Sequence, residues 1–227
     1  KATMIIIPIH TNNNMKYSFC TLFDSGYLAR GLCMYESLIK HCSTAHLYIF
    51  AFDQKTYEVL ETLALKNATI IPLDQFEDKS LLTAKKERTW REYCWTCTPS
   101  IILYPINYFN LEHCIYLDAD LYFYKNPTIL LEELKKNSIL LTEHNYSKEY
   151  DQTENSGKYC VQFMFFKNDR KGIKALIWWR DRCLEWCYAY HENGKFGDQK
   201  YLDDWLTRFE GIHVLKHSGG GVAPWNI

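Results

Sequence analysis

The sequence predicts an α/β protein with three layers, in which helices cover both faces of a mostly parallel central sheet. Short runs rich in β-branched and aromatic residues alternate with longer segments whose apolar residues repeat at helical spacing. The first three runs and two intervening helices form a βαβαβ series, which requires parallel strands. A chain of 227 residues, 47% hydrophobic and 23% charged, can bury one sizeable core.

The N-terminal half supplies this parallel series. Strands are expected at residues 17–23, 46–52 and 68–73, with helices at 28–42 and 55–65. A polar, charged segment follows and carries no predicted element, and a long apolar helix is expected after it. These two segments are residues 75–92 and 99–109.

The C-terminal half continues the alternation. The expected strands are residues 114–124, 138–142, 159–166 and 212–216, and the expected helices are 128–136, 172–190 and a short one from Gly197. The polar residues 144–157 are typical of a mobile loop, which either closes over a ligand or is a disordered surface loop. No repeat or linker divides the chain, so one domain is expected over 1–227, with residues 1–14 either a leader or an extra edge strand.

Charge and cysteine usage narrow the class of protein. A net charge of −1 without a basic patch gives no indication of a nucleic-acid partner. An odd number of scattered cysteines, nine in all, favours reduced thiols and a cytoplasmic protein. No apolar run reaches the roughly 18 residues of a transmembrane helix. A position at the inner face of the cytoplasmic membrane, through peripheral contact, stays open.

Two carboxylates interrupt the most apolar run, CIYLDADLYFY at residues 114–124. In a strand, residues two apart point to the same face, so Asp118 and Asp120 are expected to project together. Unpaired buried charge costs on the order of several kcal/mol, which Mg²⁺ or Mn²⁺ offsets while sharing the carboxylates with substrate phosphates. The pair therefore predicts a metal–diphosphate clamp at the end of a strand. Alternatively, the strand ends at Leu117 and the pair forms a solvated turn.

The same run resembles the D-x-D segment of glycosyltransferases with the GT-A fold, and it is most similar to the bacterial family-eight type. Three further segments support the resemblance, which extends over most of the chain, from Tyr17 to Trp225. They are FDSGY at residues 23–27, GDQ at 197–199 and HSGGGVAPW at 217–225.

The resemblance implies a retaining transfer of a sugar from a nucleotide-diphosphate donor, a UDP-sugar, to a glycan or lipid-linked acceptor in bacterial envelope glycan synthesis. It implies manganese or magnesium held by Asp118, Asp120 and His217, and places Asp198 and Gln199 at the reacting sugar. The donor site that it implies consists of Phe23, Asp24, Tyr27, Asp118, Asp120, Gly220 and Trp225.

Three regions depart from the pattern of that family. The arginine that usually precedes the D-x-D strand is not evident, because Thr98 and Pro99 occupy that region. Ala223 stands where the family usually has a lysine that reaches the phosphates. Residues 160–162, Cys-Val-Gln, replace the usual asparagine–alanine–glycine. Single residues also have structural explanations, since Asp198 can be a helix N-cap and Asp24 a turn residue.

Three other functions stay open at this point. A haloacid dehalogenase-like phosphatase also has a D-x-D at a strand end, but Leu121 follows the pair here where a small residue is usual. A sugar nucleotidyltransferase shares the layout and the metal, although DSGYLARG at residues 24–31 is a poor phosphate loop. A cation-dependent sugar-binding module would need no nucleotide site.

Overall fold

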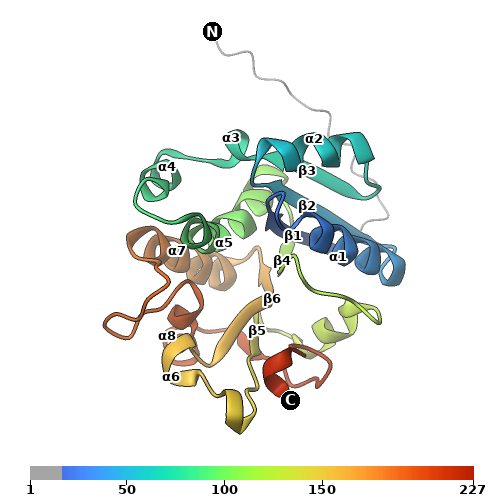
Figure 1. The fold of residues 1–227 in the computed structure, drawn as a ribbon. Coiled ribbons are helices and arrows are strands. Elements are labelled where there is room, and N and C mark those ends of the chain that lie inside the picture. Colours follow the sequence, from blue (N-terminus) through green and yellow to red (C-terminus); the bar gives the residue numbers. More distant parts are fainter. Residues whose placement is uncertain (1–16) are drawn as a thin grey trace.

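The computed structural model describes residues 17–227, in which one seven-stranded sheet lies between helices (Figure 1). Residues 1–14, expected as a leader or an edge strand, lie outside the described residues. The strand order across the sheet is β3-β2-β1-β4-β6-β5-β7. The strands are β1 (Tyr17–Phe23), β2 (Ala45–Ala51), β3 (Ala68–Pro72), β4 (His113–Leu117), β5 (Ile139–Glu143), β6 (Tyr159–Lys167) and β7 (Ile212–Val214).

The sheet is mostly parallel, as predicted. β1 pairs in parallel with both β2 and β4, β2 pairs with β3, and β5 pairs with β7. β6 is the exception, because it runs antiparallel to its neighbours β4 and β5. The carboxyl ends of β1, β2 and β4 therefore meet at one edge, where the amino end of β6 joins them. Ligands bind at this edge in open α/β sheets.

Helices cover both faces of the sheet. The α-helices are α1 (Leu28–His41), α2 (Gln54–Leu63), α3 (Leu73–Phe76), α4 (Lys79–Lys85), α5 (Trp90–Tyr108), α6 (Thr153–Ser156), α7 (Arg170–Glu185) and α8 (Trp205–Arg208). Four 3₁₀ helices are described, namely η1 (Pro127–Glu133), η2 (Lys148–Tyr150), η3 (Gln199–Leu202) and η4 (Pro224–Asn226).

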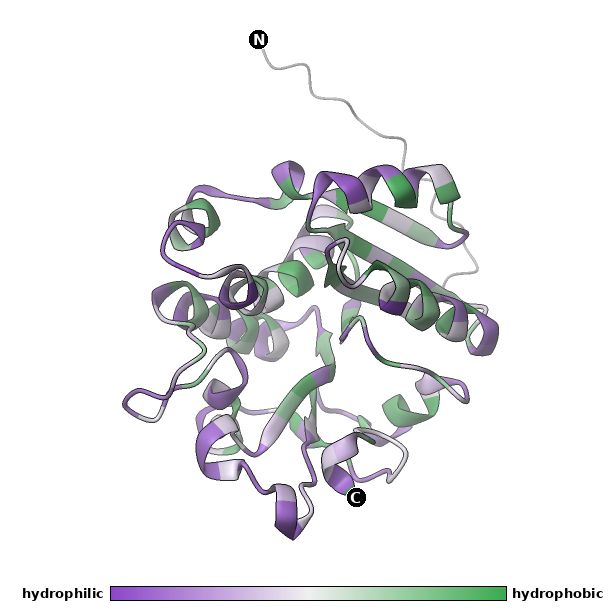
Figure 2. Cartoon of the chain, in the orientation of Figure 1, coloured by the Kyte–Doolittle hydropathy of each residue, from purple (hydrophilic) through white to green (hydrophobic). Residues whose placement is uncertain are grey.

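Successive strand residues alternate between two apolar clusters, because side chains of a strand point to opposite faces. Phe19 of β1 packs with Met34 of α1 and Leu60 of α2 in one cluster. The next residue, Cys20, packs on the other face with the long helices α5 and α7. Figure 2 shows hydrophobic residues concentrated on the central strands that lie between these two layers.

Several elements differ from the sequence-based expectation. Residues 75–92 contain the helix α4 and the start of α5, which begins at Trp90. A capping box fixes that start, since Thr89 accepts from the Glu92 amide while Glu92 accepts from the Thr89 amide. The helix expected at 128–136 is the 3₁₀ helix η1, with Asn126 as its cap.

The segment 144–157, expected as a mobile loop, contains η2 and α6. Its first residues are fastened to the C-terminal segment. The Trp225 indole N–H donates to the His144 carbonyl at 3.0 Å, and the Ser147 amide donates to the Trp225 carbonyl at 2.9 Å. These contacts give the segment 144–147 a structural role as the support of η4.

None of the helices within residues 17–227 is both long enough and apolar enough to pass through a bilayer. The nine cysteines are free thiols, and Cys183 and Cys187 are fully buried in the core.

Candidate functional site

The strand β4 ends at Leu117, immediately before the carboxylate pair. The expectation that the strand continues to residue 124 is wrong, because the apolar residues after the pair belong to an irregular segment. The Asp118 amide still donates to the Gln162 carbonyl of β6 at 3.0 Å, and the chain then turns, with the Leu121 amide facing the Asp118 carbonyl. A charged pair is costly inside a sheet, so the ladder stops where the carboxylates begin.

The two carboxylates differ in their surroundings. Asp118 is half-buried and accepts a hydrogen bond of 2.7 Å from the Tyr116 hydroxyl, whereas Asp120 is exposed. Burial raises the pKa of Asp118 to about 6, and the negative charge of Asp120 adds to the increase, against the Tyr116 hydrogen bond. Both residues follow the carboxyl end of β4 in a turn, so the expectation that they project together from within a strand is wrong, and the alternative that the strand ends at Leu117 is what the structure shows.

Asp198 is a third carboxylate at this edge of the sheet. It is only 3% exposed, and its Oδ2 atom has no hydrogen-bond partner among the described residues. Burial raises its pKa to about 7; the Thr98 hydrogen bond opposes this increase and the negative charge of Asp118 adds to it. The indole of Trp179 on α7 donates to the Asp198 carbonyl at 2.8 Å. The structure therefore brings Asp198 within electrostatic range of Asp118.

Cys160 of β6 lies within range of the same charges. Burial raises the pKa of its thiol, and the charges of Asp118, Asp198 and Asp120 add to that increase. The negative charges of Asp118, Asp120 and Asp198 therefore all act on the surroundings of Cys160, although these carboxylates do not form a group arranged to hold a metal ion.

A cavity of about 560 Å³ opens beside Asp120. Three segments line it, namely the first turns of α1, residues 120–122 after β4, and residues 222–225 at the C-terminal end, together with Gln162 of β6. Among the predicted donor-site residues, Asp120 and Trp225 line this cavity.

The turn after β1 is built around Asp24. One oxygen of Asp24 accepts from the amides of Gly26 and Tyr27, and the other accepts from the Trp90 indole at 2.7 Å. The Tyr27 ring is exposed and lies 4.8 Å below the guanidinium of Arg30. Asp24 therefore shapes the entrance to α1 and also joins it to α5.

Phe23 lies in the core rather than on the cavity. Its side chain is 2% exposed and packs against Gly31 of α1, where a Cβ atom would lie 2.5 Å from the Phe23 ring. From this position the Phe23 side chain does not make the donor contact that the resemblance implies for it.

The glycine-rich C-terminal loop packs tightly on the end of β7. A Cβ atom on Gly220 would lie 2.2 Å from Leu215 Cδ2, so this position has no room for a larger residue. His217 is exposed, and its Nδ1 atom accepts from the Gly219 amide at 3.0 Å.

The predicted metal ligands are only partly brought together. Within residues 17–227, no group of three or more His, Cys, Asp and Glu side chains is arranged to hold a metal ion, so His217 does not join the pair in such a group. The Asp118–Asp120 pair alone nevertheless suits Mg²⁺ or Mn²⁺, which commonly take one or two carboxylates and complete their shell with water and phosphate oxygens.

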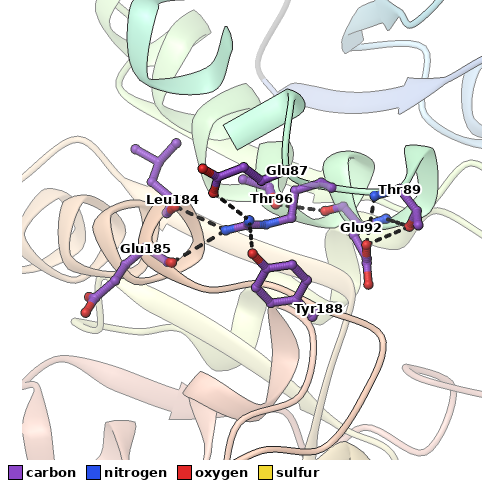
Figure 3. Close-up of polar contacts among 8 residues, drawn as sticks. Glu87, Thr89, Glu92, Thr96, Leu184, Glu185 and Tyr188 are labelled. Carbon is purple, nitrogen blue, oxygen red and sulfur yellow. Dashed lines mark hydrogen bonds and ion pairs between the residues drawn. The ribbon is translucent and has the colours of Figure 1, made fainter. Parts of the chain in front are cut away.

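A polar network holds the segment that leads to Asp198 (Figure 3). Arg88 donates to the Tyr188 hydroxyl at 2.5 Å and to the Leu184 and Glu185 carbonyls at the end of α7. Glu92 accepts from the Ala189 amide at 2.8 Å. The Gly197 amide in turn donates to the Tyr188 carbonyl at 3.0 Å, which fixes the residue before Asp198. The α4–α5 turn thus positions a buried carboxylate distant in sequence.

Arg30, Cys33 and Gln162 line the cavity and were not predicted as site residues. Gln162 could have been found by the reasoning used for the aspartates, because its amide interrupts the otherwise apolar and aromatic run YCVQFMFF. Arg30 and Cys33 give no comparable indication, since both are ordinary residues of an amphipathic helix.

No family model matches the chain. Two curated proteins of Bacillus subtilis (strain 168) are similar along most of its length. The uncharacterized protein YfnD is 33% identical over 218 residues, which cover 93% of this chain and 69% of YfnD. The uncharacterized protein YfnF is 32% identical over 220 residues, covering 93% of this chain and 73% of YfnF.

Solved glycosyltransferase structures share the fold. The glycosyltransferase GlyE of Streptococcus pneumoniae TIGR4 matches with a TM-score of 0.56 and 18% identity, covering 89% of this chain and 46% of GlyE. The bifunctional glycosyltransferase WbbM matches with a TM-score of 0.58 and 12% identity, covering 92% of this chain and 40% of WbbM. The galactosyltransferase LgtC was solved with donor and acceptor sugar analogues. It matches with a TM-score of 0.55 and 12% identity, covering 87% of this chain and 72% of LgtC. The chain thus spans less than half of GlyE and of WbbM, and the predicted GT-A fold is confirmed.

Proposed function

This chain belongs to the family of the Bacillus subtilis proteins YfnD and YfnF and has the GT-A fold, and we propose that it is a glycosyltransferase. Its donor in this proposal is a nucleotide-diphosphate sugar, specifically a UDP-sugar, and its acceptor is a glycan or a lipid-linked sugar. The transfer retains the configuration at the anomeric carbon.

The observation that carries the proposal is the position of the Asp118–Asp120 pair. Both carboxylates follow a buried strand of a largely parallel sheet, and Asp120 borders a cavity large enough for a nucleotide. Cofactor and substrate pockets of a few hundred Å³ at this edge are typical of open α/β sheets.

Asp118 and Asp120 are the proposed protein ligands of Mn²⁺ or Mg²⁺. When bound, such an ion supplies Lewis-acid stabilisation of negative charge on a leaving diphosphate. The raised pKa of Asp118 supports this role, because an ionised carboxylate at this position gains from a nearby cation.

Asp198 and Gln199 are the proposed residues at the reacting sugar. Asp198 is a buried carboxyl with a free oxygen and a pKa near neutrality, so a small change in its surroundings alters its charge. The Gln199 amide nitrogen donates to the Ser156 carbonyl at 2.8 Å, which orients the side chain and leaves its carbonyl oxygen for a ligand. Asp24, Tyr27, Gly220 and Trp225 complete the proposed donor site.

A donor screen tests the proposal. The protein is incubated with a panel of UDP-sugars and Mn²⁺, and release of UDP is measured with and without a chelator. At least one UDP-sugar should release UDP in a manner that requires the metal. Asp120→Ala should lower the rate by at least about a hundredfold, whereas Asp181→Ala, an exposed aspartate on α7, should retain it. Turnover that is unaffected by Asp120→Ala would remove the pair from the reaction.

A further inference from the structure

Arg30 is a cation without an ionic partner at the mouth of the cavity. It lies in the first turn of α1, its side chain is exposed, and it borders the same cavity as Asp120. Its guanidinium lies 4.8 Å from the Tyr27 ring, but it forms no ion pair with any residue of the described chain. Arg30 and Asp120 are the two charged residues among those that line the cavity in the described chain.

The position of Arg30 on its helix is unfavourable for a cation in the free protein. The amino end of a helix carries a partial positive charge, which favours anions there. α1 has no acidic residue in its first turn, and its N-cap residue Tyr27 makes no side-chain hydrogen bond to the first amides. An anion in the cavity would therefore interact favourably with the helix end and with the guanidinium together.

Gln162 independently indicates a polar ligand in this cavity. Its side chain is only 6% exposed and lines the cavity, yet its amide has no hydrogen-bond partner in the described chain. A Cβ atom on Gly221 would lie 3.4 Å from its Nε2 atom, so the amide lies beneath the C-terminal loop. An amide that makes no hydrogen bond within the described chain and lines a cavity is suited to bind a ligand there.

We propose that Arg30 and the first turn of α1 bind the diphosphate of the donor, opposite the Asp118–Asp120 pair. The inference rests on the proposed function and deepens it, because it assigns the cation that selects a nucleoside diphosphate over a nucleoside. The C-terminal loop contributes no charge here, since Val222, Ala223, Pro224 and Trp225 line its side of the cavity. A guanidinium matches phosphate oxygens with two parallel hydrogen bonds, which gives the site directional selectivity.

Binding measurements with three probes test this assignment. UDP, UMP and uridine are titrated by calorimetry in the presence of Mn²⁺, on the wild type and on Arg30→Gln, Arg30→Lys and Arg170→Gln. Arg170 is a matched control, because it is an exposed arginine in the first turn of a helix that follows the opposite end of β6. Arg30→Gln should weaken UDP binding by about tenfold and leave uridine binding unchanged. Arg30→Lys should restore part of the lost UDP affinity.

Alkylation of Cys33 gives a second readout without any turnover. Cys33 lines the cavity and is the exposed cysteine of the chain, whereas Cys94 is half-buried and the others are buried. UDP with Mn²⁺ should slow N-ethylmaleimide labelling of Cys33. The UDP concentration needed for this protection should be about tenfold lower in the wild type than in Arg30→Gln.

The outcomes separate the two proposals. If UDP binds the wild type and Arg30→Gln with equal affinity, the assignment of Arg30 is overturned while a nucleotide site remains. If uridine binding falls as much as UDP binding in Arg30→Gln, the arginine supports the fold rather than the diphosphate, which also overturns the assignment. If UDP fails to bind the wild type at all, the proposed function fails, and the role of Arg30 fails with it.

Discussion

Replacing Asp198 by asparagine should change the way in which stability depends on pH. The Asp198 carboxyl is 3% exposed, and its pKa is raised from 3.8 to about 7 by burial, with a further contribution from the charge of Asp118. In the unfolded chain the same carboxyl ionises near pH 3.8. Between these values the folded protein holds a proton that the unfolded chain does not, so the wild type loses stability as the pH rises.

The magnitude follows from the two pKa values. A difference of about 3 pH units corresponds to roughly 4 kcal/mol once both states are ionised. About 2.5 kcal/mol of this loss falls between pH 5 and pH 8. Asparagine keeps the volume of the side chain and the oxygen that accepts from Thr98, but it cannot ionise. The variant should therefore lack this loss and be the more stable protein at pH 8.

Urea unfolding of the wild type and Asp198→Asn at pH 5 and pH 8, with a chelator present, measures the difference. Asp53→Asn is the control. Burial opposes ionisation of Asp53, but hydrogen bonds from Ser25 and Thr56 outweigh it and lower the pKa to about 2, so this group is ionised throughout the range. Its substitution should lower stability equally at both pH values. If the free energy of unfolding changed by the same amount in the wild type and in Asp198→Asn between pH 5 and pH 8, the reasoning would be refuted.

Three further predictions concern stability. Asp53→Asn should cost about 1 kcal/mol at pH 7, because asparagine can still cap α2 but lacks the negative charge that the Ser25 and Thr56 amides stabilise. The cost should vanish as the pH falls from about 4 to 2, because the depressed pKa of Asp53 stabilises the protein only above that range; a cost that persists in urea titrations at pH 2 would contradict this. Arg88→Met should lower the free energy of unfolding by roughly 2–4 kcal/mol, because three buried acceptors lose the guanidinium that donates to them. A decrease of less than about 1 kcal/mol, measured by thermal denaturation, would argue against a structural role. Gly220→Ala should destabilise by about 1–3 kcal/mol because of the Leu215 clash, and less in a Leu215→Ala background; equal effects in both backgrounds would exclude the clash.

Much of the fold could be predicted from the sequence, because strands that are buried on both faces appear as short continuous apolar runs, and the helices between them as apolar residues at helical spacing. Residues 17–23 were expected as a strand and are one, and the next helix starts at Leu28 as expected. The run after Asp120 misled the prediction, since aromatic residues favour strands by composition, yet Tyr122 and Tyr124 are exposed here. Composition cannot indicate that a chain has left its sheet.

The candidate site divides along similar lines. A local motif was sufficient to find Asp118 and Asp120, because charge inside an apolar run requires an explanation. Arg30 and Gln162 meet at the cavity only through the pairing of β1 with β4 and of β4 with β6, and that arrangement is not written in any local pattern. Phe23 shows the reverse error, because a residue next to a turn that is predicted to bind a ligand can still belong to the core.

Calorimetric titration of UDP, with and without Mn²⁺, on the wild type and on Asp120→Ala tests the central claim most directly. The account predicts binding that requires the metal and disappears in the variant, because the carboxylate pair holds the ion that the diphosphate shares. Failure of UDP to bind the wild type, or equal metal-dependent binding by Asp120→Ala, would contradict the account of this site as a metal–diphosphate clamp.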